Sequence, residues 1–260
     1  MGCVLTIFTR MKKILFLIAA LVIIPGLRAQ SGFLAGQSRY PRVRAALEEK
    51  AETIDACLAT HGLDRGRFHI LITAYKVEGL LEIHAKDREE SAYRKIAEYR
   101  ICARSGSPGP KRRQGDRQVP EGFYYIDRFN PSSNYHLSLG ISYPNGADRI
   151  RCDASDPGGD IFIHGSCVTI GCLPMTDDQI REIYLYAVYA RDNGQTRIPV
   201  YIFPFRLEEN NLDAYIRRYA PGEELTAFWE NLRQGYTLWR DSGRELTFSV
   251  DRTGNYVFRP

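Results

Sequence analysis

Short apolar runs, separated by polar and glycine-rich segments, predict strands along most of this chain, and a few stretches show helical spacing. Strands are predicted over residues 68–75, 80–85, 122–126, 136–142, 160–164 and 198–205. Helices are predicted over residues 41–61, 177–194, 212–218 and 223–232, and a terminal hairpin over residues 245–250 and 255–258. Many strands with few helices predict a mixed α+β fold.

The helix expected before Gly194 has the best-marked start. Thr176-Asp177-Asp178-Gln179 has the form of a capping box, in which the first and last side chains cap each other's backbone amides. Apolar residues then recur at helical spacing up to Gly194. A helix is therefore predicted directly after the segment that carries the candidate chemistry.

The first 29 residues have the pattern of a secretory signal. Lys12 and Lys13 precede an apolar run over residues 14–24, Pro25-Gly26 ends that run, and cleavage is expected after Ala29. A membrane anchor is the alternative, but a spanning helix needs about 20 apolar residues and this run is shorter. We therefore expect an exported protein of the periplasm or cell envelope, which meets the membrane only through its signal sequence.

Removal of the signal leaves the protein formally neutral. The whole chain has 35 Lys and Arg residues against 31 Asp and Glu residues. Four of the basic residues lie in the first 29 residues, which hold no acid, so 31 of each sign remain. Nucleic acid is therefore not an expected partner.

Residues 161–172 bring a histidine and a cysteine into one short segment. His164 ends a predicted strand and Gly165 lets the chain turn away, whereas Cys172 follows Gly171. An imidazole that takes the proton of a thiol converts cysteine into an acyl-transfer nucleophile. The backbone amides of Gly171 and Cys172 are candidates to donate to a developing oxyanion. The following helix start modestly favours a thiolate at Cys172.

His164-Gly165, followed by Thr169-Ile170-Gly171-Cys172, resembles the active-site motif of the L,D-transpeptidase catalytic-domain (YkuD) family, in its YafK-like branch. Further similar segments are residues 109–122, 136–139, 143–145 and 158–165. The resemblance implies a β-rich catalytic core with flanking helices and a C-terminal cap. It also implies Cys172 as nucleophile, His164 as general base, Gly165 and Thr169 as supporting residues, and no cofactor or metal.

The resemblance further implies a substrate. Such enzymes attack peptide bonds next to diaminopimelate in the stem peptides of peptidoglycan, and the YafK-like branch also includes hydrolysis of the link to a wall-attached lipoprotein. Acyl transfer to an amine and amide hydrolysis therefore both stay open. Arg117, His136 and Tyr143 are further candidates for contacts to the stem peptide.

Two positions depart from the wider family. That family usually has a second histidine where this chain has Ile170, and Arg or Asn where it has Pro174. Substrate contacts of typical transpeptidases are therefore not carried over to these two positions.

Four segments follow from these patterns. They are a signal peptide (1–29), an N-terminal helix with strands that pack on the core (30–100), the L,D-transpeptidase-like catalytic domain (101–206) and a C-terminal helical cap with a hairpin (207–260). The Gly-, Pro- and Arg-rich stretch between Cys102 and Pro120 is predicted to be a loop beside the cleft, because long loops in compact domains are often functional.

The cysteine count tests the nucleophile assignment. Five cysteines remain after the signal, so an exported chain would leave at least one unpaired, and Cys172 is the expected free thiol. Bridges between Cys57 and Cys102 and between Cys152 and Cys167 are one arrangement, and five reduced thiols are another.

Two functions of other classes use the same residues. Cys152, His164, Cys167 and Cys172 have the ligand types of a zinc site, although their spacing matches no common zinc pattern. A wall-binding module that keeps the fold without turnover is the second alternative.

Overall fold

The computed structural model describes residues 32–152, 155–219 and 222–259. The predicted signal peptide lies outside these residues. The described residues belong to one compact unit. Within it, no helix combines the length and the apolar character that crossing a bilayer requires.

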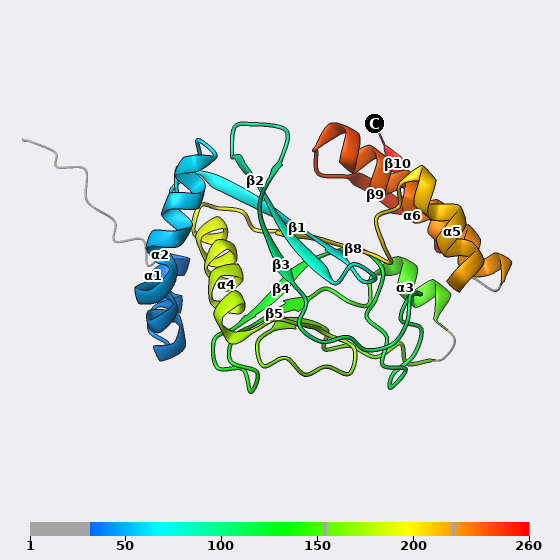
Figure 1. The fold of residues 1–260 in the computed structure, drawn as a ribbon, viewed down its shortest axis with the longest axis horizontal. Helices are drawn as coiled ribbons and strands as arrows, with labels where there is room; N and C mark the ends of the chain where they lie inside the picture. The colour runs from blue at the N-terminus through cyan, green and yellow to red at the C-terminus, as the bar shows by residue number, and fades with distance from the viewer. Residues whose placement is uncertain (1–31, 153–154, 220–221, 260) are drawn as a thin grey trace, which may run out of the picture. The chain divides into compact units, whose positions relative to one another are not determined.

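An eight-stranded sheet forms the centre of the fold, in the order β3-β2-β1-β8-β4-β5-β6-β7, and β9 and β10 form a separate hairpin (Figure 1). The strands are β1 (Phe68–Tyr75), β2 (Leu80–Asp87), β3 (Arg94–Arg100), β4 (Gly122–Asn130), β5 (Ser138–Ile141), β6 (Phe162–His164), β7 (Leu173–Pro174), β8 (Pro199–Phe203), β9 (Thr247–Val250) and β10 (Tyr256–Arg259).

Strand β8 joins the two halves of this sheet. It pairs in parallel with β1, where Ile72 lies opposite Val200, and antiparallel with β4, where Tyr124 lies opposite the same valine. The strands of residues 30–100 and those of residues 101–206 therefore share one sheet and one core.

Six helices flank the strands in the described residues. They are α1 (Phe33–Gln37), α2 (Pro41–Thr60), α3 (Gly146–Arg151), α4 (Asp177–Asp192), α5 (Glu209–Tyr219) and α6 (Glu223–Ser242). Figure 1 shows α1, α2 and α4 at one side of the sheet, and α5, α6 and the hairpin at the other. The predicted capping box of α4 is present, with both reciprocal hydrogen bonds between Thr176 and Gln179.

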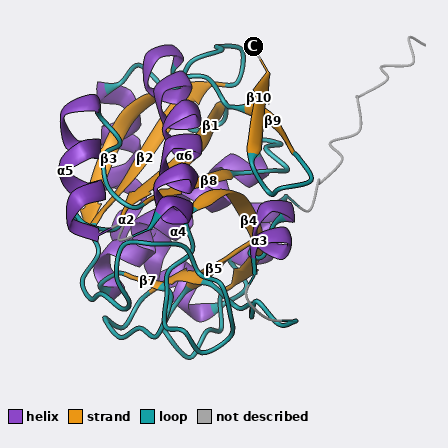
Figure 2. Cartoon of the chain, turned by 90° about the vertical axis from the view of Figure 1, so that its right-hand side faces the viewer, coloured by secondary structure: helices purple, strands orange, loops and turns teal. Residues whose placement is uncertain are grey.

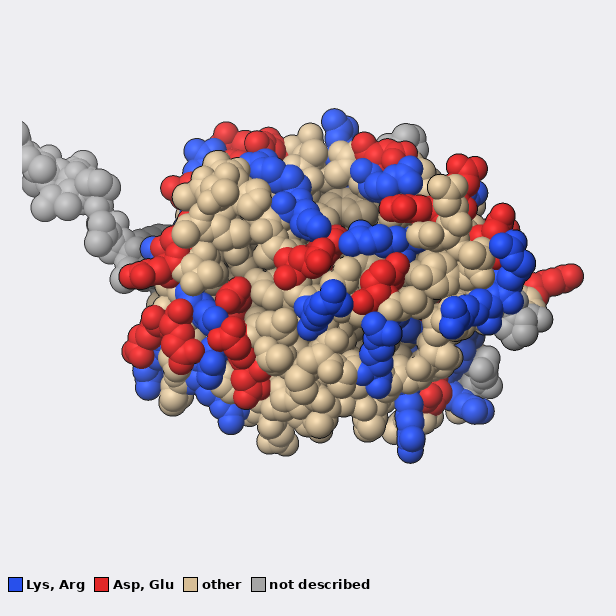
Figure 3. Space-filling model, viewed as in Figure 1, with Lys and Arg blue, Asp and Glu red and all other residues tan. Residues whose placement is uncertain are grey.

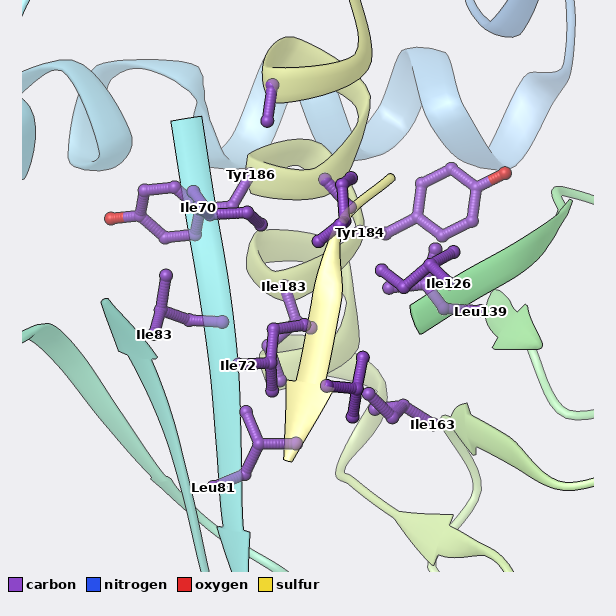
Figure 4. Close-up of a cluster of buried hydrophobic side chains, with 14 of the residues drawn as sticks. Ile70, Ile72, Leu81, Ile83, Ile126, Leu139, Ile163, Ile183, Tyr184 and Tyr186 are labelled. Atoms are coloured by element: carbon purple, nitrogen blue, oxygen red, sulfur yellow. The ribbon is translucent and has the colours of Figure 1, made fainter. Parts of the chain in front are cut away.

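Buried side chains form two clusters on opposite faces of the sheet, because successive strand residues point to opposite sides. The first cluster lies between the sheet and α4, as Figure 4 shows for Ile72, Ile163 and Ile183. The second cluster is rich in aromatic residues and includes Phe123 of β4 and Trp229 of α6. We call the side that carries the second cluster the outer face.

The mixed α+β prediction is confirmed, and most predicted strands and helices are present. Strands β3 and β7 and helices α1 and α3 were not predicted from the sequence. Strand β3 is an edge strand with a register shift against β2 and many exposed charges, so it lacks a regular apolar pattern. Helix α6 continues beyond residue 232 and ends at Gly243, whose positive φ of 63° glycine adopts without strain.

Candidate active site

The sheet brings the segments of His164 and Cys172 together. Strand β7 pairs in parallel with β6, so that Leu173 lies opposite Ile163, and both are buried in the first cluster. His164 follows Ile163 along β6 and must point the other way, to the outer face. Cys172 lies directly before β7, next to Leu173.

Hydrogen bonding orients the imidazole of His164. Its Nδ1 lies 2.6 Å from the carbonyl oxygen of Gly165, and because a carbonyl only accepts, Nδ1 carries the proton. The Nε2 lone pair is then available to accept a proton. Burial lowers the pKa of His164, although the bond to Gly165 acts in the opposite direction. The ring is a neutral base at neutral pH.

The thiol of Cys172 is free and half-buried. Its Sγ lies 3.7 Å from the carbonyl oxygen of Asp160, and the described residues show no hydrogen bond between Sγ and the His164 ring. Burial raises the pKa of Cys172, and the Asp160 carboxylate adds to this effect. Burial therefore disfavours the thiolate that the following helix start is expected to favour. The pair rests as a neutral thiol and a neutral imidazole.

Thr169 holds the nucleophile loop closed. Its Oγ1 accepts from the backbone amides of Gly171 at 3.2 Å and Cys172 at 2.8 Å, and donates to the carbonyl oxygen of Cys172 at 2.9 Å. The two amides predicted to hold an oxyanion are thus occupied in this structure. They become available to a substrate only when the Thr169 hydroxyl releases them.

Two glycines permit close approaches at this loop. A Cβ on Gly165 would lie 2.6 Å from Oδ1 of Asp177 and 3.0 Å from the Cβ of His136. Gly171 has a φ of 141°, and a Cβ there would lie 3.1 Å from the carbonyl oxygen of Gln118. The loop predicted between Cys102 and Pro120 therefore packs directly against the residue before the nucleophile.

Arg117 is presented at the site. It is exposed and belongs to the loop segment that contacts Gly171, and the described residues provide no ion-pair partner for its guanidinium. The nearby carboxylate of Asp116 is engaged by Lys111 at 2.7 Å. The contact of Arg117 with a substrate carboxylate stays a prediction.

The other two substrate-contact candidates have contacts inside the fold. The buried Tyr143 donates its hydroxyl to the carbonyl oxygen of Pro157 at 2.9 Å. His136 lies with Nδ1 4.0 Å from Oδ2 of Asp177, at the start of α4, and its backbone oxygen accepts from Arg42 of α2 at 2.6 Å. These contacts give both residues a part in holding the site's surroundings.

Sequence reasoning missed Tyr135. Its ring centroid lies 4.8 Å from that of His164 with an angle of 39° between the planes, and the residue is 47% exposed. Ser138 was missed as well: it lies opposite His164 in the β5–β6 pair, and its buried Oγ has no hydrogen-bond partner among the described atoms. Neither residue type in this context points to catalysis, so the sequence offered no specific signal.

Backbone strain concentrates around the same segments. A positive φ at a residue other than glycine costs about 1–3 kcal/mol and persists only where surrounding contacts hold it. The described residues with this conformation are Arg117, His136, Asp160, Ser166 and Cys167. All of them border the strands and loops that carry the imidazole and the thiol.

A disulfide joins Cys102 to Cys167. The suggested pairs Cys57–Cys102 and Cys152–Cys167 are therefore wrong, whereas the expected free thiol at Cys172 is confirmed. The end of strand β7 brings the two bridged cysteines together. The backbone amide of Cys102 donates to the carbonyl oxygen of Pro174 at 3.0 Å, and the backbone amide of Cys167 donates to the carbonyl oxygen of Met175 at 3.4 Å.

The same disulfide removes a ligand from the zinc hypothesis. The sulfur of Cys167 is bonded to Cys102 and is not available as a thiolate. Over the described residues, no group of three or more His, Cys, Asp or Glu side chains is arranged to hold a metal ion. The four-residue zinc set is therefore wrong.

We expect loss of this disulfide to weaken both the fold and the site. The bridge closes a sequence separation of 65 residues, for which the chain-entropy model gives about 4 kcal/mol. The double change Cys102→Ser, Cys167→Ser should lower the free energy of unfolding by about 2–5 kcal/mol in a urea titration. Reductant added to the unmodified protein should reproduce the loss, and an unchanged unfolding midpoint in both experiments would contradict it.

Comparison with known proteins identifies the family. The family model described as L,D-transpeptidase catalytic domain, YkuD, matches residues 79–202. YafK of Escherichia coli strain K12, which its name assigns provisionally to the L,D-transpeptidases, is 36% identical over 190 residues, covering 72% of this chain and 73% of that protein. YafK of Escherichia coli O157:H7 gives the same values.

Solved structures of two proteins are looser matches. The helical cell shape determining protein Pgp2 of Campylobacter jejuni aligns over 75% of this chain and 80% of its own, with 17% identity and a TM-score of 0.41. Bd1075 of Bdellovibrio bacteriovorus aligns over 72% and 76%, with 18% identity and a TM-score of 0.38. The sequence match to YafK spans more than two thirds of both proteins, and the family model includes His164 and Cys172. The chain therefore belongs to the L,D-transpeptidase catalytic domain (YkuD) family.

Proposed function

We propose that this protein is an exported cysteine enzyme of peptidoglycan, which transfers acyl groups of diaminopimelate-containing stem peptides through a thioester on Cys172. Family membership supports a peptidoglycan-related transpeptidase. One observation carries the residue assignment: the free thiol of Cys172 lies directly before β7, and β7 pairs with the strand that carries the oriented imidazole of His164.

The first half-reaction begins with a rotation of the thiol away from the Asp160 carbonyl. His164 Nε2 accepts the thiol proton as Sγ attacks the carbonyl carbon of the stem peptide. The new C–S bond forms, the C–N bond breaks, and the imidazolium returns its proton to the leaving amine. The product is a thioester on Cys172. Hydrogen bonds of catalytic groups are often long before substrate binds, which is consistent with the resting contact of Sγ.

The second half-reaction depends on the acceptor. An amine that gives its proton to His164 and attacks the thioester forms a new amide and releases the Cys172 thiol. Water in the same position gives a free carboxylate and makes the enzyme a hydrolase, which would cleave cross-links or release a wall-attached lipoprotein. The same two side chains serve both outcomes.

Two features support action outside the cytoplasm. The Cys102–Cys167 disulfide is typical of oxidising compartments, and the predicted signal peptide leads there.

On the face shown in Figure 3, acidic and basic side chains are interspersed, with no large field of one sign. A nucleic-acid-binding protein would present a basic field, so no nucleic acid is expected as a partner.

Mass spectrometry of purified muropeptides tests the proposal. We expect the mature protein to form new cross-linked or amine-adduct masses when an amine acceptor is added. Loss of existing links without new adducts would identify a hydrolase instead. Unchanged masses together with tight binding to sacculi would overturn the enzyme and favour a wall-binding module.

The pH dependence of kcat/KM should reflect a resting enzyme in which the His164 imidazole and the Cys172 thiol are both neutral. Burial holds the pKa of His164 below its ordinary value of 6.5, and the base works only when neutral, so the acid limb of kcat/KM should lie below pH 6.5. His164→Ala should lower kcat by about 10²–10⁴-fold and remove this limb. His69→Ala is a matched control, because burial also lowers the pKa of that histidine.

Alkylation gives the second half of the pH test. Burial raises the pKa of Cys172 above its ordinary value of 9.0, so its reaction with iodoacetamide should still accelerate beyond pH 9.0. The peptide that carries Cys152 serves as an internal control in the same digest. A Cys172 rate that stays constant between about pH 6 and pH 8 would indicate a thiolate–imidazolium pair and contradict the neutral resting state.

A further inference from the structure

A cavity of about 670 Å³ lies on the outer face, apart from the nucleophile. Strand β4, the start of β8, the N-terminal end of α3 and strand β9 surround it, and Figure 2 shows the hairpin next to β4 and α3. Ligand pockets in proteins have volumes of about 300–1,000 Å³, so this cavity has room for a ligand of two or more rings.

A chain of side-chain and backbone contacts connects the cavity wall to Cys172. Asp127, which lines the cavity, accepts from Nε of Arg128 at 3.2 Å, and Nη1 of Arg128 lies 2.9 Å from Oδ1 of Asp160. The backbone oxygen of Asp160 contacts Sγ of Cys172. The ion pairs of Arg128 therefore lie between the cavity and the thiol, and a long substrate can cross them.

Strand register places the cavity and the site on one face. Phe123 of β4 lies opposite Tyr201, and both belong to the outer cluster. A register shift follows Ile126, so that Arg128 points to the same side and its guanidinium lies 4.8 Å over the ring of Phe162. Phe162 shares its face with His164.

The lining combines an exposed aromatic ring with hydrogen-bonding groups of both signs. Tyr125 is 37% exposed, and the guanidinium of Arg197 lies 4.6 Å from its ring centroid. Arg149 and Arg197 form no ion pair with any carboxylate of the described residues, so their donors are available. Two carboxylates, on Asp127 and Glu245, also line the cavity, and Asp127 is paired with Arg128. With donors and acceptors side by side, this lining suits a ligand rich in hydroxyl and amide groups.

We propose that this cavity binds the glycan strand of peptidoglycan, that is, N-acetylated sugar units linked to the stem peptide under attack. The inference rests on the proposed function and adds a subsite to it. A tyrosine ring packs on the apolar face of a sugar, while guanidinium and carboxylate groups pair with its hydroxyl and acetamide groups. Binding the glycan would present its stem peptide to Cys172 across Arg128.

Binding of chitotetraose, the uncharged N-acetylglucosamine tetramer, tests the cavity without catalysis. Calorimetric titration of the mature protein should show saturable binding, weakened about tenfold or more by Tyr125→Ala. Thr247→Trp fills the cavity from the exposed edge of β9 and should have the same effect without removing a packed side chain. Tyr40→Ala, at a tyrosine of 41% exposure, and Arg252→Ala in the exposed hairpin turn are matched controls.

Steady-state kinetics test the link to turnover. The disaccharide tetrapeptide should have a KM about tenfold lower than the free tetrapeptide, and Thr247→Trp should bring this ratio close to one. Turnover of both substrates without chitotetraose binding would overturn the glycan site and leave the proposed function intact. A cavity variant that raises KM for the free tetrapeptide equally would also overturn it, because the cavity would then hold the peptide. Chitotetraose binding that the two cavity variants weaken, without turnover of either substrate, would retain the site and refute the proposed function.

Discussion

Cys172→Ala should abolish turnover of stem-peptide substrates, with kcat lowered by at least about 10⁴-fold. The proposed thioester forms on the sulfur of Cys172, and no neighbouring group in the described site can replace this sulfur. The fold should be retained, because the side chain is half-buried and the loop is held by Thr169 and the disulfide. Muropeptide mass spectrometry and an unfolding curve measure the two effects separately.

Cys152→Ala is the matched control for this experiment. Cys152 is likewise free and partly exposed, and its Sγ donates to the Arg149 oxygen at 3.2 Å. The Cys152→Ala variant should retain the activity of the unmodified protein. Turnover that persists in a Cys172→Ala protein of verified mass would refute the nucleophile assignment.

Glu121→Ala should lower the free energy of unfolding by about 3–5 kcal/mol, the largest stability effect we expect. Glu121 is fully buried, and its Oε1 accepts from Lys76 Nζ at 2.8 Å and the Gly109 amide at 2.7 Å. Its Oε2 accepts from Trp229 Nε1 at 2.9 Å. Burial lowers the pKa of Lys76, and loss of the carboxylate would leave that amine without its counter-charge.

A double change distinguishes a lost ion pair from lost packing. Glu121→Leu combined with Lys76→Met should recover much of the stability, because the apolar replacements leave no buried charge unpaired. Asp241→Ala removes the exposed pair with Arg240 and should cost at most about 1 kcal/mol in the same urea titration. Additive losses in the double variant would contradict the ion-pair explanation.

The effect of Glu121 should extend to activity. Lys76 also donates to the carbonyl oxygens of Gly109 and Val119, which both belong to the loop that packs on Gly171. Through Trp229, the same carboxylate ties that loop to helix α6. The C-terminal cap therefore supports the loop beside the nucleophile.

The hydrophobic pattern of the sequence predicts the buried strands best. Strand β1 has the predicted bounds, because both of its faces are covered and its apolar run is continuous. Strand β3 was not predicted because it lies at the sheet edge. Strand β7 was not predicted because it has only two residues, Leu173 and Pro174, which are too few to show a periodic pattern. Tertiary pairing, rather than local preference, makes both into strands.

Motif and chain order identified the thiol, the imidazole and Thr169, because all three lie in one short segment. The disulfide partner and the Lys76–Glu121–Trp229 contacts come from distant segments, and single residues of these types carry no local signal. Ile170 replaces the second histidine of the wider family and is 80% exposed. A base in that place would stand in solvent, and the proposed mechanism therefore assigns both proton transfers to His164.

Strand β8 sets an order of assembly. The chain leaves the ribosome from its N-terminus, so β1 and β4 emerge long before residues 199–203. Until then, β1 and β4 each present a row of unpaired amides and carbonyls, the arrangement that invites aggregation. Any product truncated before β8 would carry these two open edges permanently. Nascent chains of this protein therefore need protection by chaperones until nearly four fifths of the polypeptide has been synthesised.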